Sequence, residues 1–146
     1  MAIRKASHAT YNIQYHVVWI PKYRKLILDD EIRPELESLL HGICERYGFT
    51  IEELTVMEDH VHVFLSAPPR YAPSEVVKIL KGITAIELFR RFPSLKSRLW
   101  GGHLWSRGYY IGTSGDKVTN DLIKRYIKYQ QAEEDPPTEA EQMDLF

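Results

Sequence analysis

The alternation of apolar and polar residues predicts four strands, in residues 11–20, 49–57, 59–66 and 109–113. The first is rich in β-branched and aromatic residues and ends at Pro21. A short turn separates the second and third strands, so we expect these two to pair as a hairpin.

Three segments repeat their apolar residues at the spacing of a helix. The first covers residues 29–47, and Gly48 follows it as the expected C-cap. The second begins at Pro73 and ends before Pro93. The third covers residues 120–131. The expected buried stripe of the second helix consists of Val76, Ile79, Leu80, Ile83 and Ile86.

The order strand, helix, strand, strand, helix, strand is typical of an α+β ferredoxin-like sandwich, an antiparallel sheet with helices on one face. Gly82 interrupts the second helix at a cost of about 1 kcal/mol relative to alanine, so we expect a close helix contact there, with approach of a ligand as the alternative. An additional C-terminal helix follows a link with Gly112, Ser114 and Gly115. It can therefore pack on its own sheet or on a partner's.

The composition indicates one domain. At 146 residues and 44% hydrophobic residues, the chain has room for a single core, which we assign to residues 1–131, followed by an acidic tail in residues 132–146. No apolar run approaches the roughly 18 residues of a membrane span, and the N-terminus lacks the apolar core of a signal peptide. The lone Cys44 fits a reducing compartment. These features predict a cytoplasmic protein.

The net charge of −1 hides an asymmetry between domain and tail. Residues 133–146 hold six Asp and Glu residues and no Lys or Arg, so the preceding chain has 19 basic against 14 acidic residues, a net charge of +5. A basic domain suits phosphate binding, although a modest positive charge does not by itself indicate DNA binding.

Two histidines two residues apart are the first candidate for chemistry. His60 and His62 project from one face of a strand, because side chains at i and i+2 point the same way. They form half of a metal site, although an isolated pair is more often an ordinary feature of a strand surface. Asp59 is expected to be a turn residue, and the alternative is that it or Glu58 assists the metal. His16, on the first strand, is interpreted as structural.

The C-terminal helix carries the second candidate. Tyr126 and Gln130 are four residues apart and therefore lie one turn apart on the same face. A tyrosine hydroxyl can act as a nucleophile, and a glutamine amide oxygen can bind a metal. Tyr129 is the main alternative nucleophile, with Glu133 one turn later as its ligand.

The two motifs together resemble the single-tyrosine HUH transposases of small insertion sequences, the TnpA type within the HUH endonuclease superfamily. The resemblance runs from about residue 11 to residue 131 and includes the stretches 57–62 and 99–105. It implies a transposase that cleaves and rejoins single-stranded DNA through a 5′-phosphotyrosine and recognises hairpins near the ends of an insertion sequence. It also implies a homodimer in which the histidines of one subunit meet the tyrosine helix of the other.

On this resemblance, Tyr126 is the nucleophile, and His60, His62 and Gln130 hold a divalent metal. Two neutral imidazoles and an amide oxygen suit Mg²⁺ or Mn²⁺, and the histidines make Mn²⁺ a good occupant. The ion would neutralise charge on the scissile phosphate. A phenol with a pKa of about 10 is protonated at neutral pH. We therefore expect attack to depend more on the placement of the Tyr126 hydroxyl against the phosphate than on formation of a free phenolate.

Basic and aromatic residues outside these motifs are the predicted DNA contacts. Cations bind phosphates, and aromatic rings stack on bases with about 1–3 kcal/mol per base. For Trp100 and Trp105, a place in the core is an equal alternative. The basic loop of residues 22–25, after the first strand, can equally be a solvated turn. The predicted contacts are Lys22, Arg24, Lys78, Lys81, Trp100, Trp105 and Arg107.

The chain ends in a pentapeptide, residues 142–146, that resembles the motif with which bacterial proteins dock onto the DNA sliding clamp. A glutamine amide and a Leu-Phe pair on an acidic, unfolded segment can enter an apolar pocket of another protein. Gln142, Leu145 and Phe146 are therefore predicted partner contacts. The alternative is that the apolar pair packs on this chain's own domain.

Three other functions compete with an active transposase. The first is a domesticated DNA-hairpin-binding protein that no longer transposes, which the intact motif set disfavours. The second is a replication initiator or relaxase of the same superfamily, which the short length and the lack of a helicase segment disfavour. The third, a metal-dependent hydrolase unrelated to DNA, would need a carboxylate or a third histidine beside the pair, and the sequence offers no clear candidate.

Overall fold

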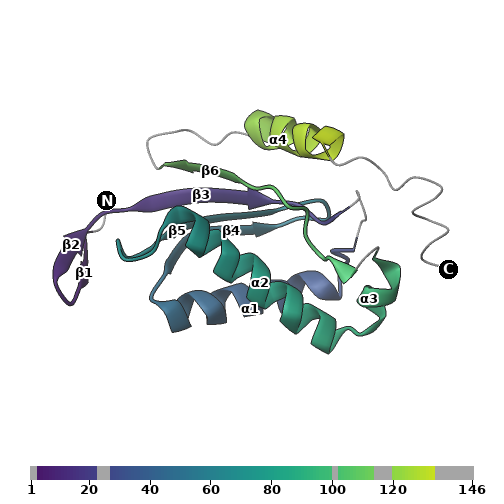
Figure 1. Ribbon diagram of the computed structural model, residues 1–146, viewed down its shortest axis with the longest axis horizontal. Coiled ribbons are helices and arrows are strands. Elements are labelled where there is room, and N and C mark those ends of the chain that lie inside the picture. The colour runs from purple at the N-terminus through teal and green to yellow at the C-terminus, as the bar shows by residue number, and fades with distance from the viewer. Residues whose placement is uncertain (1–2, 23–26, 100–101, 114–119, 134–146) are drawn as a thin grey trace.

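The computed structural model describes residues 3–22, 27–99, 102–113 and 120–133. At its centre is a four-stranded antiparallel sheet (Figure 1). The strands lie across it in the order β4 (Thr50–Val56), β5 (Val61–Ser66), β3 (Gln14–Trp19) and β6 (Tyr110–Thr113). This order and the observed antiparallel pairing of β4 with β5, which was predicted as a hairpin, confirm the ferredoxin-like α+β fold.

Two long helices cover one face of the sheet. α1 (Ile32–Tyr47) and α2 (Pro73–Arg91) run along the lower side of the sheet in Figure 1. The strand residues that point toward them are fully buried, as their alternation predicts. These residues are Val17 and Trp19 of β3 and Val61, Val63 and Leu65 of β5.

Hydrogen bonds cap both ends of α1. The Asp29 carboxylate accepts hydrogen bonds from the backbone N–H groups of Glu31 and Ile32, both at 3.0 Å. At the other end Gly48 has a φ of 75°, and its N–H donates to the carbonyls of Cys44 and Glu45. The predicted glycine C-cap is therefore confirmed.

Two expectations for α2 are wrong. Ile86 was expected in the buried stripe, but its side chain is 68% exposed. The buried line instead runs through Val76, Leu80, Thr84 and Leu88, and Ile86 lies outside it because it is two residues out of that i+4 series. The expected close helix contact at Gly82 is also absent from the described part of the chain, where a Cβ added to Gly82 would meet nothing within 4 Å.

The structure also contains elements that the sequence pattern did not predict. The expected first strand begins later than predicted, because β3 starts at Gln14 and Tyr11 belongs to β2 (Ala9–Tyr11). β2 forms a small hairpin with β1 (Arg4–Ala6), which the sequence pattern did not predict. A short helix, α3 (Ser94–Arg98), follows α2 and is anchored by the buried Leu95. These short elements carry too few residues to show a period.

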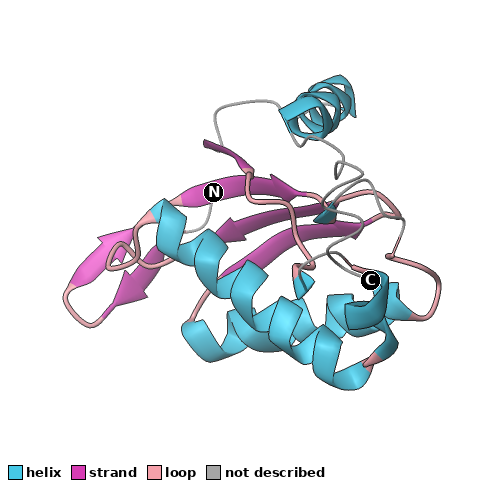
Figure 2. Cartoon of the chain, turned by 45° about the vertical axis from the view of Figure 1, so that its right-hand side comes forward, coloured by secondary structure: helices cyan, strands magenta, loops and turns pink. Residues whose placement is uncertain are grey.

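The last helix, α4 (Asn120–Glu133), lies on the face of the sheet opposite α1 and α2 (Figures 1 and 2). Its Ile123 and Ile127 pack on Val18 of β3 and on Ile20, the residue that follows β3, so α4 packs on its own sheet. The residues of the link from 114 to 119 and the predicted tail from 134 onward lie outside the described residues. Within the described parts of the chain, none of the helices has the length and apolar character needed to cross a bilayer.

Candidate active site

The sheet face beneath α4 carries one of the two predicted histidine ligands. The register pairs Val18 with His62 of β5 on one side and with Tyr110 of β6 on the other. Directly paired residues project to the same face, so these three side chains form a row across the sheet. Ile123 and Ile127 of α4 pack on the middle of this row through Val18.

His60 immediately precedes β5 and is oriented by its neighbour Asp59. Its Nδ1 lies 2.8 Å from the Asp59 carboxylate, and its side chain is only 13% exposed. A carboxylate only accepts, so the His60 Nδ1 carries the proton and Nε2 keeps its lone pair. Asp59 thus contacts the predicted ligand, which favours the alternative that it assists a metal.

His62 is held by a third imidazole. Its Nε2 lies 3.0 Å from the Nδ1 of His16, whose ring is stacked on Phe64 with centroids 4.0 Å apart. Burial, together with repulsion from His16 and His60, lowers the pKa of His62 to about 4. His62 is therefore neutral at physiological pH, the form in which imidazole binds metals.

This lowered pKa predicts how the stability of the metal-free protein depends on pH. Between pH 6.5 and about 4, the unfolded chain protonates His62 and the folded chain does not, so the free energy of unfolding should fall as the pH falls through this window. His62→Gln should lose less stability than the wild type between pH 6.5 and 4.5 in urea unfolding. An equal loss in both proteins, with the exposed His41→Gln as the matched control, would contradict the prediction.

Tyr126 lies on the face of α4 that turns toward β6. It is half-buried, and its ring centroid is 6.2 Å from that of Tyr110. The Tyr110 hydroxyl in turn lies over Gly112, where an added Cβ would be 2.6 Å away, and Gly112 is paired with His16. An open cavity of about 540 Å³ borders Tyr126 here, with Arg125 also in its wall. Tyr129, the alternative nucleophile, is 62% exposed.

The Gln130 amide fits closely against Ser106 and Gly108, in the chain just before β6, and we call this contact site the Gln130 seat. Its Nε2 donates to the Ser106 hydroxyl at 2.8 Å, and its Oε1 would be 2.1 Å from a Cβ added to Gly108. Only glycine leaves room for this amide. In the described residues, no hydrogen bond joins Gln130 to His60 or His62, and no three His, Cys, Asp or Glu side chains converge to hold a metal.

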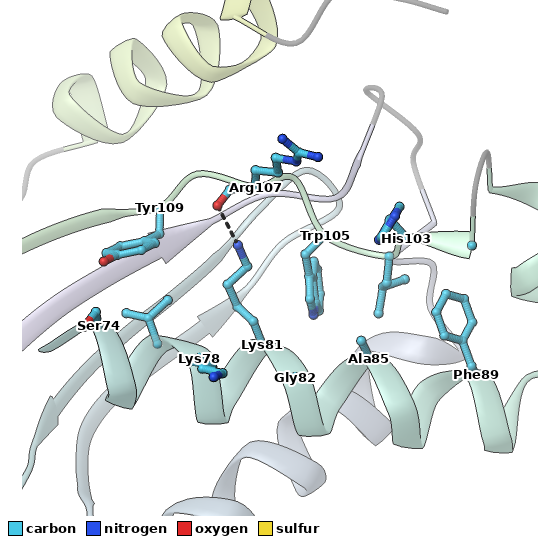
Figure 3. Close-up of a pocket in the computed structure, with 13 residues that line it drawn as sticks. Ser74, Lys78, Lys81, Gly82, Ala85, Phe89, His103, Trp105, Arg107 and Tyr109 are labelled. Atoms are coloured by element: carbon cyan, nitrogen blue, oxygen red, sulfur yellow. Dashed lines mark hydrogen bonds between the residues drawn. The ribbon is translucent and has the colours of Figure 1, made fainter. Parts of the chain in front are cut away.

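Lys81 of α2 supports this seat from below. Its ammonium donates to the backbone carbonyls of Ser106 at 2.6 Å, Gly108 at 3.1 Å and Arg107 at 3.3 Å. Figure 3 draws the last of these bonds, to Arg107. The observed contacts thus give Lys81 a positioning role, and its predicted phosphate contact stays a prediction. Ser106 and Gly108 were not found from the sequence, because their role depends on which segment α4 meets.

Gly108→Ala should dislodge the Gln130 amide and loosen α4. The lost hydrogen bond is expected to cost about 1 kcal/mol, and hydrogen exchange in α4 should accelerate. The matched control is Gly82→Ala, where the added methyl meets none of the described residues within 4 Å and helix propensity predicts a gain of up to about 1 kcal/mol. Unchanged exchange in α4 of Gly108→Ala would show that the seat does not hold the helix.

The other predicted contacts divide between surface and core. Lys78 and Arg107 are exposed and line a pocket of about 390 Å³ between α2 and the chain that leads into β6 (Figure 3). Trp105 is 7% exposed and donates its indole N–H to Thr84 at 3.0 Å, which favours the core alternative. The half-buried Lys22 donates its backbone N–H to Leu104. The residues Arg24, Trp100, Gln142, Leu145 and Phe146 lie outside the described part of the chain.

The chain is similar to known transposases in sequence and in fold. Residues 9–130 match the family described as "Transposase IS200 like". The ISDra2 transposase TnpA of Deinococcus radiodurans is 37% identical over 134 residues, which cover 92% of this chain and 95% of that protein. The transposase for insertion sequence element IS200 of Salmonella typhimurium is 34% identical over 131 residues, covering 90% and 85%.

A solved structure agrees with this sequence match. It is a crystal structure of a candidate transposase from Deinococcus radiodurans R1, with 35% sequence identity and a TM-score of 0.75. The superposition covers 87% of this chain and 97% of the other. The likeness therefore extends over most of this chain and nearly the whole of the relative.

Proposed function

The chain belongs to the family of IS200-like transposases, and on this basis we propose that it cuts and rejoins single-stranded DNA at the ends of an insertion sequence. The proposed intermediate is a 5′-phosphotyrosine on Tyr126. The substrate would be a single strand that carries hairpins near the element's ends.

The observation that carries this proposal is the position of the tyrosine helix on the histidine face. α4 packs on Val18, the residue paired with His62, and the ring of Tyr126 approaches Tyr110 in the same row. The proposed nucleophile and one proposed metal ligand thus belong to one surface of the sheet, although they come from segments some sixty residues apart. Metal-assisted phosphoryl transfer needs this combination of groups.

The residues of this chain would act as follows. The Tyr126 hydroxyl attacks the scissile phosphorus, the bond from phosphorus to the 3′ oxygen breaks, and the phenolic proton is released as the 3′ oxygen gains one. The upstream strand leaves with a 3′-OH, and the downstream strand stays bound through its 5′ phosphate. Because one phosphodiester replaces another, attack by a second 3′-OH reverses the step without ATP. Arg125, in the wall of the cavity beside Tyr126, is a cation available to the phosphate backbone.

A divalent cation such as Mg²⁺ or Mn²⁺ fits the chemistry of the two histidines. Each imidazole has one ring nitrogen engaged by a protein partner, Asp59 or His16, and a second nitrogen that is not hydrogen bonded among the described residues. We propose His60, His62 and Gln130 as the ligands. When bound, such an ion supplies positive charge to the phosphate oxygens in the transition state.

The contacts of Gln130 bear on whether two subunits share an active site. Within this chain the Gln130 Nε2 donates to Ser106, and among the described residues no hydrogen bond joins Gln130, the proposed third ligand, to His60 or His62. In a homodimer, the α4 of a partner can supply it if the link before α4 carries that helix across. We therefore propose a homodimer with shared sites.

The proposed chemistry is tested with end-labelled oligonucleotides from the ends of the source element, in Mg²⁺ and in Mn²⁺. A 3′ label should become covalently attached to the protein, and a 5′ label should appear in a shorter strand that ends in a 3′-OH. The same sequence as a duplex should give no adduct. Hairpin binding without an adduct in either metal would point instead to a DNA-binding protein that no longer transposes.

The C-terminal pentapeptide is proposed to bind the DNA sliding clamp of the host bacterium. Clamp binding would bring the enzyme to replication forks, where single strands occur. Deleting residues 142–146 should weaken clamp binding at least about tenfold, because the apolar anchors of such a peptide carry most of its affinity, and cleavage of oligonucleotides should persist. Surface plasmon resonance on immobilised clamp measures this, with Thr138→Ala as the control. Equal clamp binding by the deleted and intact chains would refute the proposal.

A further inference from the structure

We infer that His16 is a positioning residue that fixes the ring of His62 so that its Nδ1 faces a bound metal ion. The inference rests on the proposal that His60 and His62 are metal ligands. His16 has no assigned role in the proposed chemistry, and the sequence alone suggested a structural histidine.

The strand register brings His16 to this position. His16 is paired with Phe64, and the next residue on the same face of β5 is His62. The His16 ring lies flat on Phe64, at an interplanar angle of 5°, and meets His62 with ring centroids 5.3 Å apart. The two nitrogens that face each other, His16 Nδ1 and His62 Nε2, are 3.0 Å apart. This is a hydrogen-bond distance for two ring nitrogens.

The direction of this hydrogen bond decides whether His62 can bind a metal. If His16 donates from Nδ1, the neutral His62 carries its own proton on Nδ1 and uses its Nε2 lone pair for His16, so neither nitrogen is left for an ion. If His62 donates from Nε2, its Nδ1 keeps a free lone pair. Metal binding in this arrangement therefore requires His16 to accept.

The same logic already holds for His60. Asp59 accepts from the Nδ1 of His60 and leaves Nε2 for a metal, as partners of metal-bound histidines commonly do. His16 would do for His62 what Asp59 does for His60. A role as a third ligand is not supported, because no three His, Cys, Asp or Glu side chains among the described residues are arranged to hold an ion.

Two substitutions separate hydrogen bonding from packing. His16→Phe keeps a flat ring that can stack on Phe64 but removes the acceptor. His16→Asn places an amide oxygen close to the position of Nδ1 and keeps the acceptor. Mn²⁺ affinity, measured by electron paramagnetic resonance without DNA, should fall about 10- to 100-fold in His16→Phe. It should largely recover in His16→Asn.

A second measurement needs no variant. Long-range ¹⁵N–¹H spectra of the wild type should find His62 protonated on Nε2, and those of His16→Phe should contain both tautomers. A wild-type His62 protonated on Nδ1 would overturn the inference, as would equal loss of Mn²⁺ affinity in both His16 variants or no loss in either. A wild type that binds no Mn²⁺ would instead overturn the proposed metal site itself, and the role of His16 with it.

Discussion

Replacing Tyr126 with phenylalanine should reduce the covalent protein–DNA adduct at least about 1,000-fold, to the background of the assay, because it removes the hydroxyl oxygen that would join the protein to the phosphorus. The substitution keeps the aromatic ring that packs beside Tyr110 and α4's contact with Val18 and Ile20. Folding and DNA binding should therefore persist. Denaturing gels with a 3′-labelled single strand measure the adduct, and gel shifts measure binding.

The matched control for this prediction is Tyr129→Phe. Tyr129 lies on the same helix, three residues later, and its side chain is 62% exposed. The adduct should persist in this variant. An adduct that survives Tyr126→Phe and disappears in Tyr129→Phe would identify Tyr129 as the nucleophile, and its i+4 residue Glu133 would then be the ligand to test.

The second large effect is expected from His62→Ala. This substitution removes one proposed metal ligand and should lower metal-dependent cleavage at least about 100-fold, while hairpin binding is retained. The control is His41→Ala, an exposed histidine on α1, which covers the opposite face of the sheet. Cleavage that His62→Ala leaves intact would remove the metal site from the proposed function.

Mixing the two inactive proteins tests whether sites are shared between subunits. If His62 of one subunit works with Tyr126 of the other, a dimer of His62→Ala and Tyr126→Phe chains contains one intact composite site. Random exchange of subunits should then restore about a quarter of wild-type activity. If each site is built within one chain, the mixture should stay inactive, because every site lacks either the histidine or the tyrosine.

Much of the fold could be predicted because its signals are local. Apolar periodicity found α1, α2 and α4, and Gly48 marked the end of α1 through its left-handed backbone. The hairpin of β4 and β5 followed from a short turn between two strands. Ile86 was assigned to the buried stripe because it stands three residues after Ile83, at helical spacing, although burial in α2 follows the line of i+4 residues through Leu80 and Leu88.

Only part of the candidate site could be predicted from the sequence, because its contacts join segments that are far apart in the chain. His60 and His62 could be placed on one face from their spacing alone. His16 meets His62 only because β3 and β5 pair in one particular register, and that register is a property of the whole sheet. The seat of Gln130 on Ser106 and Gly108 depends in the same way on where α4 packs, which no local pattern encodes.

The most direct test of the central claim is to locate the DNA on the protein. The protein is first allowed to react with single-stranded DNA from the end of the element in Mn²⁺. Trypsin then cleaves after Arg125 and after Lys128, so Tyr126 and Tyr129 fall into different peptides. Mass spectrometry after nuclease trimming should find the nucleotide on the peptide of residues 126–128, as a 5′-phosphotyrosine. A nucleotide on the peptide that begins at residue 129, or cleaved DNA with no nucleotide on the protein, would contradict the account.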